Sequence, residues 1–256
     1  MLSQFKYYLR QKRAKGKFVK LINLIALGNY KIKNFKQYLN RKNAYHEISN
    51  INYSDRQMDW VKFIFSASDG FFKPIQNQWE ISQLLNLIQK QQPKLVLEIG
   101  TANGGTLFLL TRHSHERAKI ISIDLPYGPN GGGFPEWKIP IFKKFAQSKQ
   151  SINFIRGDSH SSSTLSAIKD ISKGEKFDVI MIDADHSYEG AKKDFFLYKP
   201  LIAKGGIIVL HDILENIYDP EINVHLLWNE LKKEYKTEEI INDKNQGCLG
   251  LGIVYL

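Results

Sequence analysis

The sequence predicts an α/β protein with a doubly wound, mostly parallel sheet, and three observations lead to this prediction. Short strands that are apolar throughout occur between residues 95 and 211, and helical patterns separate them. Strands of this kind are typical of a parallel sheet that helices cover on both faces. Near the C-terminal end, two more strands are joined by the turn-rich sequence NDKNQG, which predicts a hairpin and therefore an antiparallel strand.

The composition fits one large α/β domain with an N-terminal extension. The chain has 256 residues, of which 43% are hydrophobic, so a sizeable core can form. The one cysteine, Cys248, cannot form an internal disulfide, which fits a reducing compartment. The apolar run LINLIAL at 21–27 is too short to span a bilayer, and no cleavable signal peptide is evident. We expect a cytoplasmic protein and leave open a peripheral position at a membrane.

The basic charge is concentrated in an N-terminal arm. Residues 1–46 contain twelve Lys or Arg and no Asp or Glu, whereas the remaining chain has 24 basic and 26 acidic residues. Aromatic and aliphatic residues are interleaved with these charges. We expect a mainly helical arm over 1–74 that packs on its own domain, on a second copy in a homo-oligomer, or on an anionic membrane surface. Nucleic acid is not favoured, because no recognised binding module accompanies the charge.

Hydrophobic spacing predicts the individual elements. A helix is expected over 77–91, where apolar residues recur at helical spacing and Pro93 ends the pattern. Strands are predicted at 95–99, 120–124, 152–156, 178–183, 206–211, 237–241 and 249–255. Further helices are predicted at 104–113, 160–172, 188–202 and 223–235, and one face of the third consists of Ala191, Phe195, Tyr198 and Ile202.

The segment VLEIGTANGG, residues 96–105, joins the first strand of the sheet to a helix through a turn that contains glycines. It lacks the Gly-Lys-Ser/Thr of a Walker loop and the G-x-G-x-x-G of a dinucleotide fingerprint. Its pattern is E-x-G-x-x-x-G-G, which begins at Glu98 and places Gly100 two residues later. Such a turn leaves room for a ligand that has no diphosphate.

Asp124 closes the second strand, 24 residues after Gly100. A carboxylate at this place can accept hydrogen bonds from two ribose hydroxyls, as the corresponding acid does in dinucleotide folds. The alternative is that Asp124 caps the turn that follows it.

The sequence LEIGTANGG resembles the first motif of the class I S-adenosylmethionine-dependent methyltransferases, and the resemblance covers residues 75–256. It implies a Rossmann-like doubly wound seven-stranded sheet with a C-terminal antiparallel hairpin strand, which here would form the domain 75–256. It also implies S-adenosylmethionine as the methyl donor. The donor-binding residues that it implies are Glu98, Gly100, Thr101, Gly104, Asp124, Asp158 and Ser159.

The pair Asp158 and Ser159 belongs to the sequence RGDSH, which follows the third strand. The resemblance places this position beside the adenine, where Asp158 would accept a hydrogen bond from the exocyclic amine. A helix N-cap is an equally good interpretation of either residue from the sequence.

Two further segments carry ionisable groups to the carboxyl ends of strands, where ligands bind in open α/β sheets. IDADHSYEG at 182–190 contains Asp183, Asp185 and His186, and VLHDI at 209–213 contains His211 and Asp212. Two carboxylates from adjacent strand ends suit Mg²⁺ with water and substrate completing the shell. An alternative role for His186 is to cap the helix that starts near Ser187.

The same segments are similar to the metal-dependent O-methyltransferases, and most closely to the branch with macrolide-sugar O-methyltransferases and cephalosporin hydroxylase-like proteins. This resemblance implies a divalent cation, Mg or Mn, held by Asp183 and by the pair His211–Asp212. It implies that His186 is the general base, with Asp183 beside it in the catalytic site, and that the acceptor is a sugar or glycoside hydroxyl. The chain departs from these relatives at His211, because imidazole is a poorer ligand for Mg²⁺ and a better one for Mn²⁺, Zn²⁺ or iron.

Two other functions stay open on the sequence. One is a hydroxylase-like tailoring enzyme on the same fold, with iron held by His and Asp. The other is a non-catalytic S-adenosylmethionine-binding module that its basic arm docks to a membrane or an assembly.

The loop at 125–140, LPYGPNGGGFPEWKIP, is rich in Gly and Pro and carries Tyr127, Phe134 and Trp137. Because it follows Asp124, we expect it to cover the donor site as a lid without regular structure. The alternative is a surface loop whose aromatic side chains pack on the body.

Overall fold

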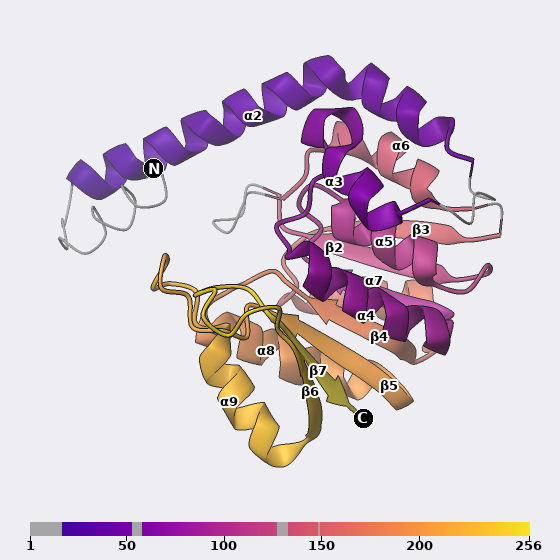
Figure 1. Cartoon of the computed structure of the whole chain (residues 1–256), viewed down its shortest axis with the longest axis vertical. Helices are drawn as coiled ribbons and strands as arrows, with labels where there is room; N and C mark the ends of the chain where they lie inside the picture. The colour runs from indigo at the N-terminus through magenta and orange to yellow at the C-terminus, as the bar shows by residue number, and fades with distance from the viewer. Residues whose placement is uncertain (1–16, 53–57, 127–132, 148) are drawn as a thin grey trace.

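The computed structural model describes residues 17–52, 58–126, 133–147 and 149–256, and it confirms the predicted sheet. The seven strands have the order β3-β2-β1-β4-β5-β7-β6 (Figure 1). They are β1 (Leu95–Ile99), β2 (Lys119–Asp124), β3 (Ser151–Arg156), β4 (Phe177–Ile182), β5 (Ile202–His211), β6 (Lys236–Ile240) and β7 (Leu251–Tyr255). The first five pair in parallel, and β7 is antiparallel to both β5 and β6, so the predicted hairpin is confirmed.

Helices cover both faces of the sheet, as strands that are apolar on both sides require. The longer helices are α2 (Lys17–Ser49), α3 (Trp60–Gly70), α4 (Gln78–Gln91), α5 (Gly105–His113), α7 (Ser162–Ser172), α8 (Tyr188–Tyr198) and α9 (Val224–Glu234). Alternate strand residues divide between two cores. Val96 packs with α3, α4 and α5, whereas Leu95 and Leu97 pack with α7, α8 and α9.

The predicted helix 188–202 is too long at its C-terminal end. The helix α8 ends at Tyr198, and a 3-10 turn over Lys199–Leu201 follows it. Pro200 has no backbone N–H, so an α-helix does not continue through it. Ile202 therefore starts β5 and does not belong to the buried face of α8.

The C-terminal part of the predicted arm packs into the body of the protein. Ala44 and Ile48 of α2 and Ile64 of α3 are buried in the same core as α4 and α5. The helix α3 was not predicted as a separate element, and the domain boundary at residue 74 stays a prediction. Among the described residues, no helix has the length and apolar character needed to cross a bilayer.

A buried carboxylate joins α4 to the loop between β6 and β7. The Glu80 side chain is fully buried; its Oε1 accepts hydrogen bonds from Asn242 N at 3.0 Å and from Gln246 Nε2 at 2.8 Å. Its Oε2 accepts from Gly250 N at 3.1 Å. Because all three donors come from the hairpin connection, Glu80 fixes the C-terminal edge of the sheet to the helix.

We predict that Glu80→Ala lowers the free energy of unfolding by about 3 kcal/mol, because it leaves three donors without their charged acceptor. Chemical denaturation of the variant and of the exposed control Glu116→Ala measures this. A loss below about 1 kcal/mol would show that Glu80 does not hold the hairpin.

Candidate active site

Gly100 brings the turn after β1 into direct contact with the end of β4. Its φ is +99°, and a Cβ atom at this position would lie 1.9 Å from the carbonyl oxygen of Asp183. Asp183 N also donates to the carbonyl of Ile99 at 2.8 Å. Only glycine adopts this backbone and allows this approach, so the turn 100–104 and Asp183 form one continuous surface.

Gly104, at the start of α5, allows a second close contact, with the ring of Phe142. It has φ +85°, and a Cβ atom there would lie 2.6 Å from the ring of Phe142. The motif LEIGTANGG therefore uses its glycines for packing and for the backbone conformation of the turn.

Asp124 shapes this turn. Its Oδ2 accepts hydrogen bonds from Thr101 N at 3.1 Å and from Ala102 N at 2.7 Å. Burial raises the pKa of Asp124 to about 6, although these hydrogen bonds act in the opposite direction. A Cβ atom at Gly133 would lie 2.9 Å from Oδ1. The predicted contact of Asp124 with a ribose stays a prediction.

Glu98 lies beneath the turn and is fully buried. Ser122 Oγ donates to its Oε2 at 3.4 Å and also contacts Thr101 Oγ1, while Oε1 has no hydrogen-bond partner among the described residues. Burial raises the pKa of Glu98 well above its ordinary value. Glu98 therefore supports the turn from below and offers no exposed carboxylate.

Neither Asp158 nor Ser159 is the N-cap of α7, which was the alternative to their predicted contact with the adenine. Ser161 caps α7, because its Oγ accepts from Thr164 N at 3.2 Å. Asp158 is exposed and accepts from His160 N at 2.8 Å, and the carbonyl of Ser159 accepts from the Tyr198 hydroxyl at 2.6 Å. The Asp158 side chain is exposed and does not cap the helix, and its predicted contact with the adenine stays a prediction.

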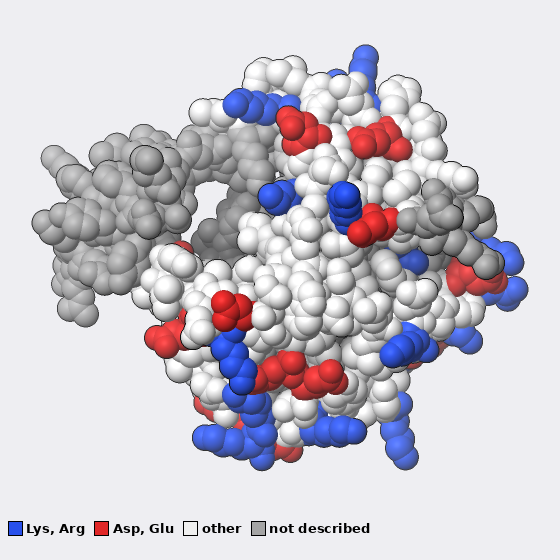
Figure 2. Space-filling model, viewed as in Figure 1, with Lys and Arg blue, Asp and Glu red and all other residues white. Residues whose placement is uncertain are grey.

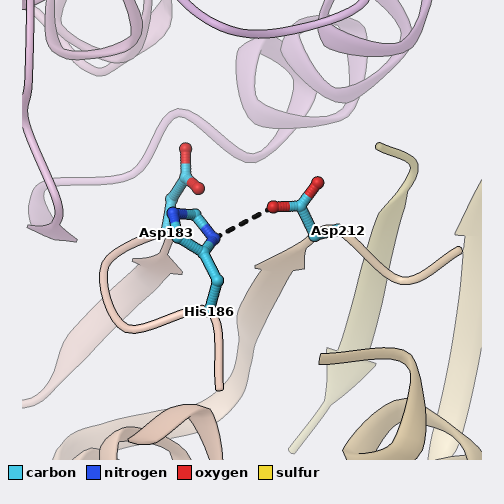
Figure 3. Close-up of side chains that lie close together, drawn as sticks. All are labelled: Asp183, His186 and Asp212. Carbon is cyan, nitrogen blue, oxygen red and sulfur yellow. Dashed lines mark ion pairs between the residues drawn. The ribbon is translucent and has the colours of Figure 1, made fainter. Parts of the chain in front are cut away.

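Three of the predicted residues come together where β4 and β5 end (Figure 3). Asp183, His186 and Asp212 each offer a ligand atom, and these atoms lie within 4.8 Å of one another. His186 Nδ1 lies 2.9 Å from Asp212 Oδ2. The cap of α8 is Ser187, whose Oγ accepts from Gly190 N at 3.0 Å, so His186 does not cap this helix. We call these three residues the carboxylate–histidine cluster.

Asp185 does not join this cluster. Its Oδ1 accepts from Ser187 N at 3.0 Å, and its side chain lies where a Cβ atom at Gly190 would be.

His211 lies behind the two aspartates of the cluster. Its Nδ1 is 3.0 Å from Asp183 Oδ1 and 3.4 Å from Asp212 Oδ2, and its side chain is buried. Consecutive strand residues normally point to opposite faces, but Asp212 has φ +61°, which turns its side chain back toward that of His211. Asp183, His186 and Asp212 could hold a metal ion together, and the predicted role of His211 as a metal ligand stays a prediction.

The charges in this network balance one another. Burial acts to lower the pKa of His211, but the carboxylates of Asp183 and Asp212 outweigh it and hold this pKa well above the ordinary value. Burial likewise acts to lower the pKa of His186, but the hydrogen bond to Asp212 outweighs it and raises this pKa above the ordinary value. Burial would raise the pKa of Asp212, but the charge of His211 and the hydrogen bond from His186 hold it well below the ordinary value.

Sequence reasoning missed Gln76, which contacts the cluster from a segment far away in the chain. Its Nε2 donates to Asp183 Oδ2 at 2.9 Å, while its own Oε1 is buried without a hydrogen-bond partner among the described residues. Gln76 stands directly before Asn77, the N-cap of α4. The contact spans 107 positions, and the sequence around Gln76 carries no signal for it.

A second missed pair holds the segment that contains Asp158. His160 Nε2 lies 3.1 Å from Oδ1 of Asp194, which is a fully buried residue of α8. The hydrogen bond to Asp194 raises the pKa of His160 above its ordinary value. Together with the bond from Tyr198 to Ser159, this pair fixes the loop after β3 to α8.

The predicted lid is only partly described. Tyr127 lies outside the described residues. Phe134 is buried against Phe142 and Phe154, and Trp137 contacts Phe71 with ring centroids 6.0 Å apart. A 3-10 turn at Glu136–Lys138 and the short helix α6 (Ile139–Phe142) follow, so this part of the segment has regular structure, contrary to expectation.

Comparisons with known proteins find the same fold and a matching domain. Residues 97–213, which contain both the glycine turn and the cluster, match a family model described as a methyltransferase domain. An O-methyltransferase from Bacillus cereus, solved in complex with SAH, has TM-score 0.55 and 17% identity over 79% of this chain and 93% of that chain. TomG, an O-methyltransferase from Streptomyces achromogenes solved with SAM, has TM-score 0.55 and 15% identity over 78% of this chain and 91% of that chain.

An uncharacterized protein of Acanthamoeba polyphaga mimivirus is 28% identical over 142 residues, and the match spans 56% of this chain and 61% of that protein. Residues 97–213 are thus similar to a methyltransferase domain, and the chain shares the fold of O-methyltransferases.

We predict that His160 stabilises the fold mainly at acidic pH. The pKa of His160 in the folded protein is raised above the ordinary value of about 6.5. The contribution of His160 to the free energy of unfolding is therefore complete below about pH 6.5 and is lost as the pH rises through the folded pKa. The difference in unfolding free energy between the wild type and His160→Asn should be larger at about pH 5.5 than at about pH 8.5. The exposed His46→Asn is the control, and a difference that grows toward alkaline pH would contradict the assignment.

Proposed function

We propose that the protein transfers the methyl group of S-adenosylmethionine to a hydroxyl oxygen of a sugar or glycoside. The observation that carries this proposal is the contact between Gly100 and Asp183, because it sets the glycine turn directly beside the carboxylate–histidine cluster. A donor lying over the turn would present its methyl group to an acceptor held at the cluster.

The donor would lie across the carboxyl ends of β1, β2 and β3. Gly100, Thr101 and Gly104 form the turn, which Glu98 supports from below, and Asp124 stands at its side. The ribose would bind at Asp124, and the adenine would bind beside the exposed Asp158 and Ser159. Two solved neighbours were crystallised with SAH or SAM, which supports the same class of donor here.

The acceptor hydroxyl needs a base, because its pKa lies far above neutrality. His186 Nδ1 faces Asp212 Oδ2, so the proton of Nδ1 is directed to this carboxylate and Nε2 is left to accept the proton of the hydroxyl. As the new O–CH₃ bond forms, the S–CH₃ bond breaks and S-adenosylhomocysteine leaves. Asp212 would thus orient the base, as well as act as a ligand.

The donor atoms of the cluster fit a divalent cation. Asp183 and Asp212 supply carboxylate oxygens from adjacent strand ends, which suits Mg²⁺ or Mn²⁺. A bound cation would stabilise the developing alkoxide as a Lewis acid. His211 Nδ1 would hold both carboxylates in place from behind.

The composition of the cluster also favours methyl transfer over the hydroxylase-like alternative. Iron oxygenases use two histidines and one carboxylate on an open face. Here the cluster has two carboxylates and one histidine, and the second histidine is buried behind them. The acceptor class rests on the resemblance of residues 183–186 and 211–212 to sugar O-methyltransferases.

Calorimetry and a methyl-transfer assay test this proposal. We predict that the protein binds S-adenosylmethionine and labels a glycoside from a panel of glycosides and catechols, and that a chelator stops transfer until Mg²⁺ or Mn²⁺ is restored. The variant His186→Gln should keep donor affinity and lose about 10²- to 10⁴-fold in kcat, whereas the exposed control His46→Gln should not change. Tight iron binding without donor affinity would overturn the function, and label in catechols alone would overturn the acceptor class.

We predict that Gln76 positions Asp183 for the cation. Removing the hydrogen bond in Gln76→Ala should raise the cation concentration needed for half-maximal activity by about 10-fold or more. The affinity for the methyl donor should stay unchanged, because the hydrogen bond of Gln76 goes to Asp183 and not to the turn 100–104. The control is the exposed Gln89→Ala, and equal cation requirements in both variants would contradict the role.

A further inference from the structure

The helix α2 has one face that packs on the body and another that points away from it. Ala44 and Ile48 are buried, and Gln37 and Asn40 donate to the backbone carbonyls of Phe71 and Ser68. Phe35 stands nine residues before Ala44, about two and a half helical turns, so these two side chains lie on opposite sides of the helix. The bonds to the body therefore fix the direction in which the outer face points.

The outer face carries an exposed apolar stripe. Ile32 is 57% exposed, Phe35 is 62% exposed and Leu39 is 63% exposed. Because these positions are three and four residues apart, their side chains follow one another along the helix. We call them the outer stripe of α2. In the sequence, apolar residues at the same spacing occur at Phe18, Leu21 and Ile25, with Gly28 as an interruption.

Positive charge surrounds the outer stripe. Lys36 and Lys42 are exposed on the same helix, and residues 1–46 contain twelve basic and no acidic residues. The rest of the chain has 24 basic and 26 acidic residues, and Figure 2 shows both signs interspersed on one face of the body. Seven of the twelve basic residues belong to α2, so basic residues and the exposed apolar side chains occur on the same helix, which extends beyond the body (Figure 1).

The combination of basic residues and exposed apolar side chains on α2 favours one kind of binding partner over others. Two copies of α2 packed on each other would bring its lysines together, and the one acidic residue in the sequence of α2, Glu47, already accepts a hydrogen bond from Ser68 of the body. Nucleic acid would meet the charge but would leave three large apolar side chains without an apolar environment. A membrane with anionic lipids offers both, because the headgroups attract lysine and the acyl chains accept Ile, Phe and Leu.

We propose that α2 lies on an anionic membrane surface, with the outer stripe at the boundary between headgroups and acyl chains. Lys36 and Lys42 then contact the lipid headgroups, and the methyltransferase body is held beside the membrane. This docking is independent of methyl transfer, so its test and the test of the proposed function can fail separately.

Flotation of the full chain with lipid vesicles tests the docking. We expect binding to vesicles of phosphatidylcholine with phosphatidylglycerol, weakening as salt rises, and no binding to phosphatidylcholine alone. The variant Ile32→Ser/Phe35→Ser/Leu39→Ser should bind at least about tenfold more weakly. The matched control is Phe196→Ser/Leu226→Ser, which removes side chains that are 45% and 46% exposed on other helices. Equal thermal unfolding of all variants would show that a loss of binding is not a loss of fold.

The charge is tested separately. Lys36→Glu and Lys42→Glu should each weaken binding by about fivefold or more, whereas the control Lys90→Glu should not. Binding to neither vesicle, or anionic binding that the outer-stripe variant leaves intact, would overturn the proposal. So would a dimer in light scattering that the outer-stripe variant dissociates, because the occupant would then be a second copy.

Discussion

A side chain at position 100 would place its Cβ atom 1.9 Å from the carbonyl oxygen of Asp183, so the turn after β1 can lie this close to the end of β4 only because this residue is glycine. This contact joins two segments that the sequence separates by more than eighty positions. It sets the turn that we propose for the donor against the cluster that we propose for the acceptor. Asp124 then holds the turn from its other side, through the amides of Thr101 and Ala102.

The chemistry of the cluster follows from how its charges are partnered. The buried carboxylate of Asp212 and the partly buried one of Asp183 would be costly to ionise alone, but each of them faces an imidazole. His211 occupies the inner side of both carboxylates, and Gln76 donates to Asp183. The outer side of the two carboxylates remains for a cation, and Nε2 of His186 remains for an acceptor. The same framework would thus orient a base and present ligands for a metal.

The sheet and the edge that carries the site could be predicted from the sequence, whereas several side-chain contacts could not. Apolar strands identified the parallel sheet, and the carboxyl ends of such strands necessarily meet at one edge. Which of His211 and Asp212 faces the crevice depends on the positive φ of Asp212, and no pattern in VLHDI reveals it. Gln76 and Asp194 reach their partners only through tertiary packing, so the spacing along the chain carries no trace of them.

A crystal structure with S-adenosylhomocysteine and Mg²⁺ tests the central claim most directly. We predict that the adenosyl group lies across the turn 100–104 with its ribose at Asp124, and that its sulfur faces the cluster formed by Asp183, His186 and Asp212. An empty crevice at saturating ligand, or a nicotinamide dinucleotide bound there in its place, would contradict it.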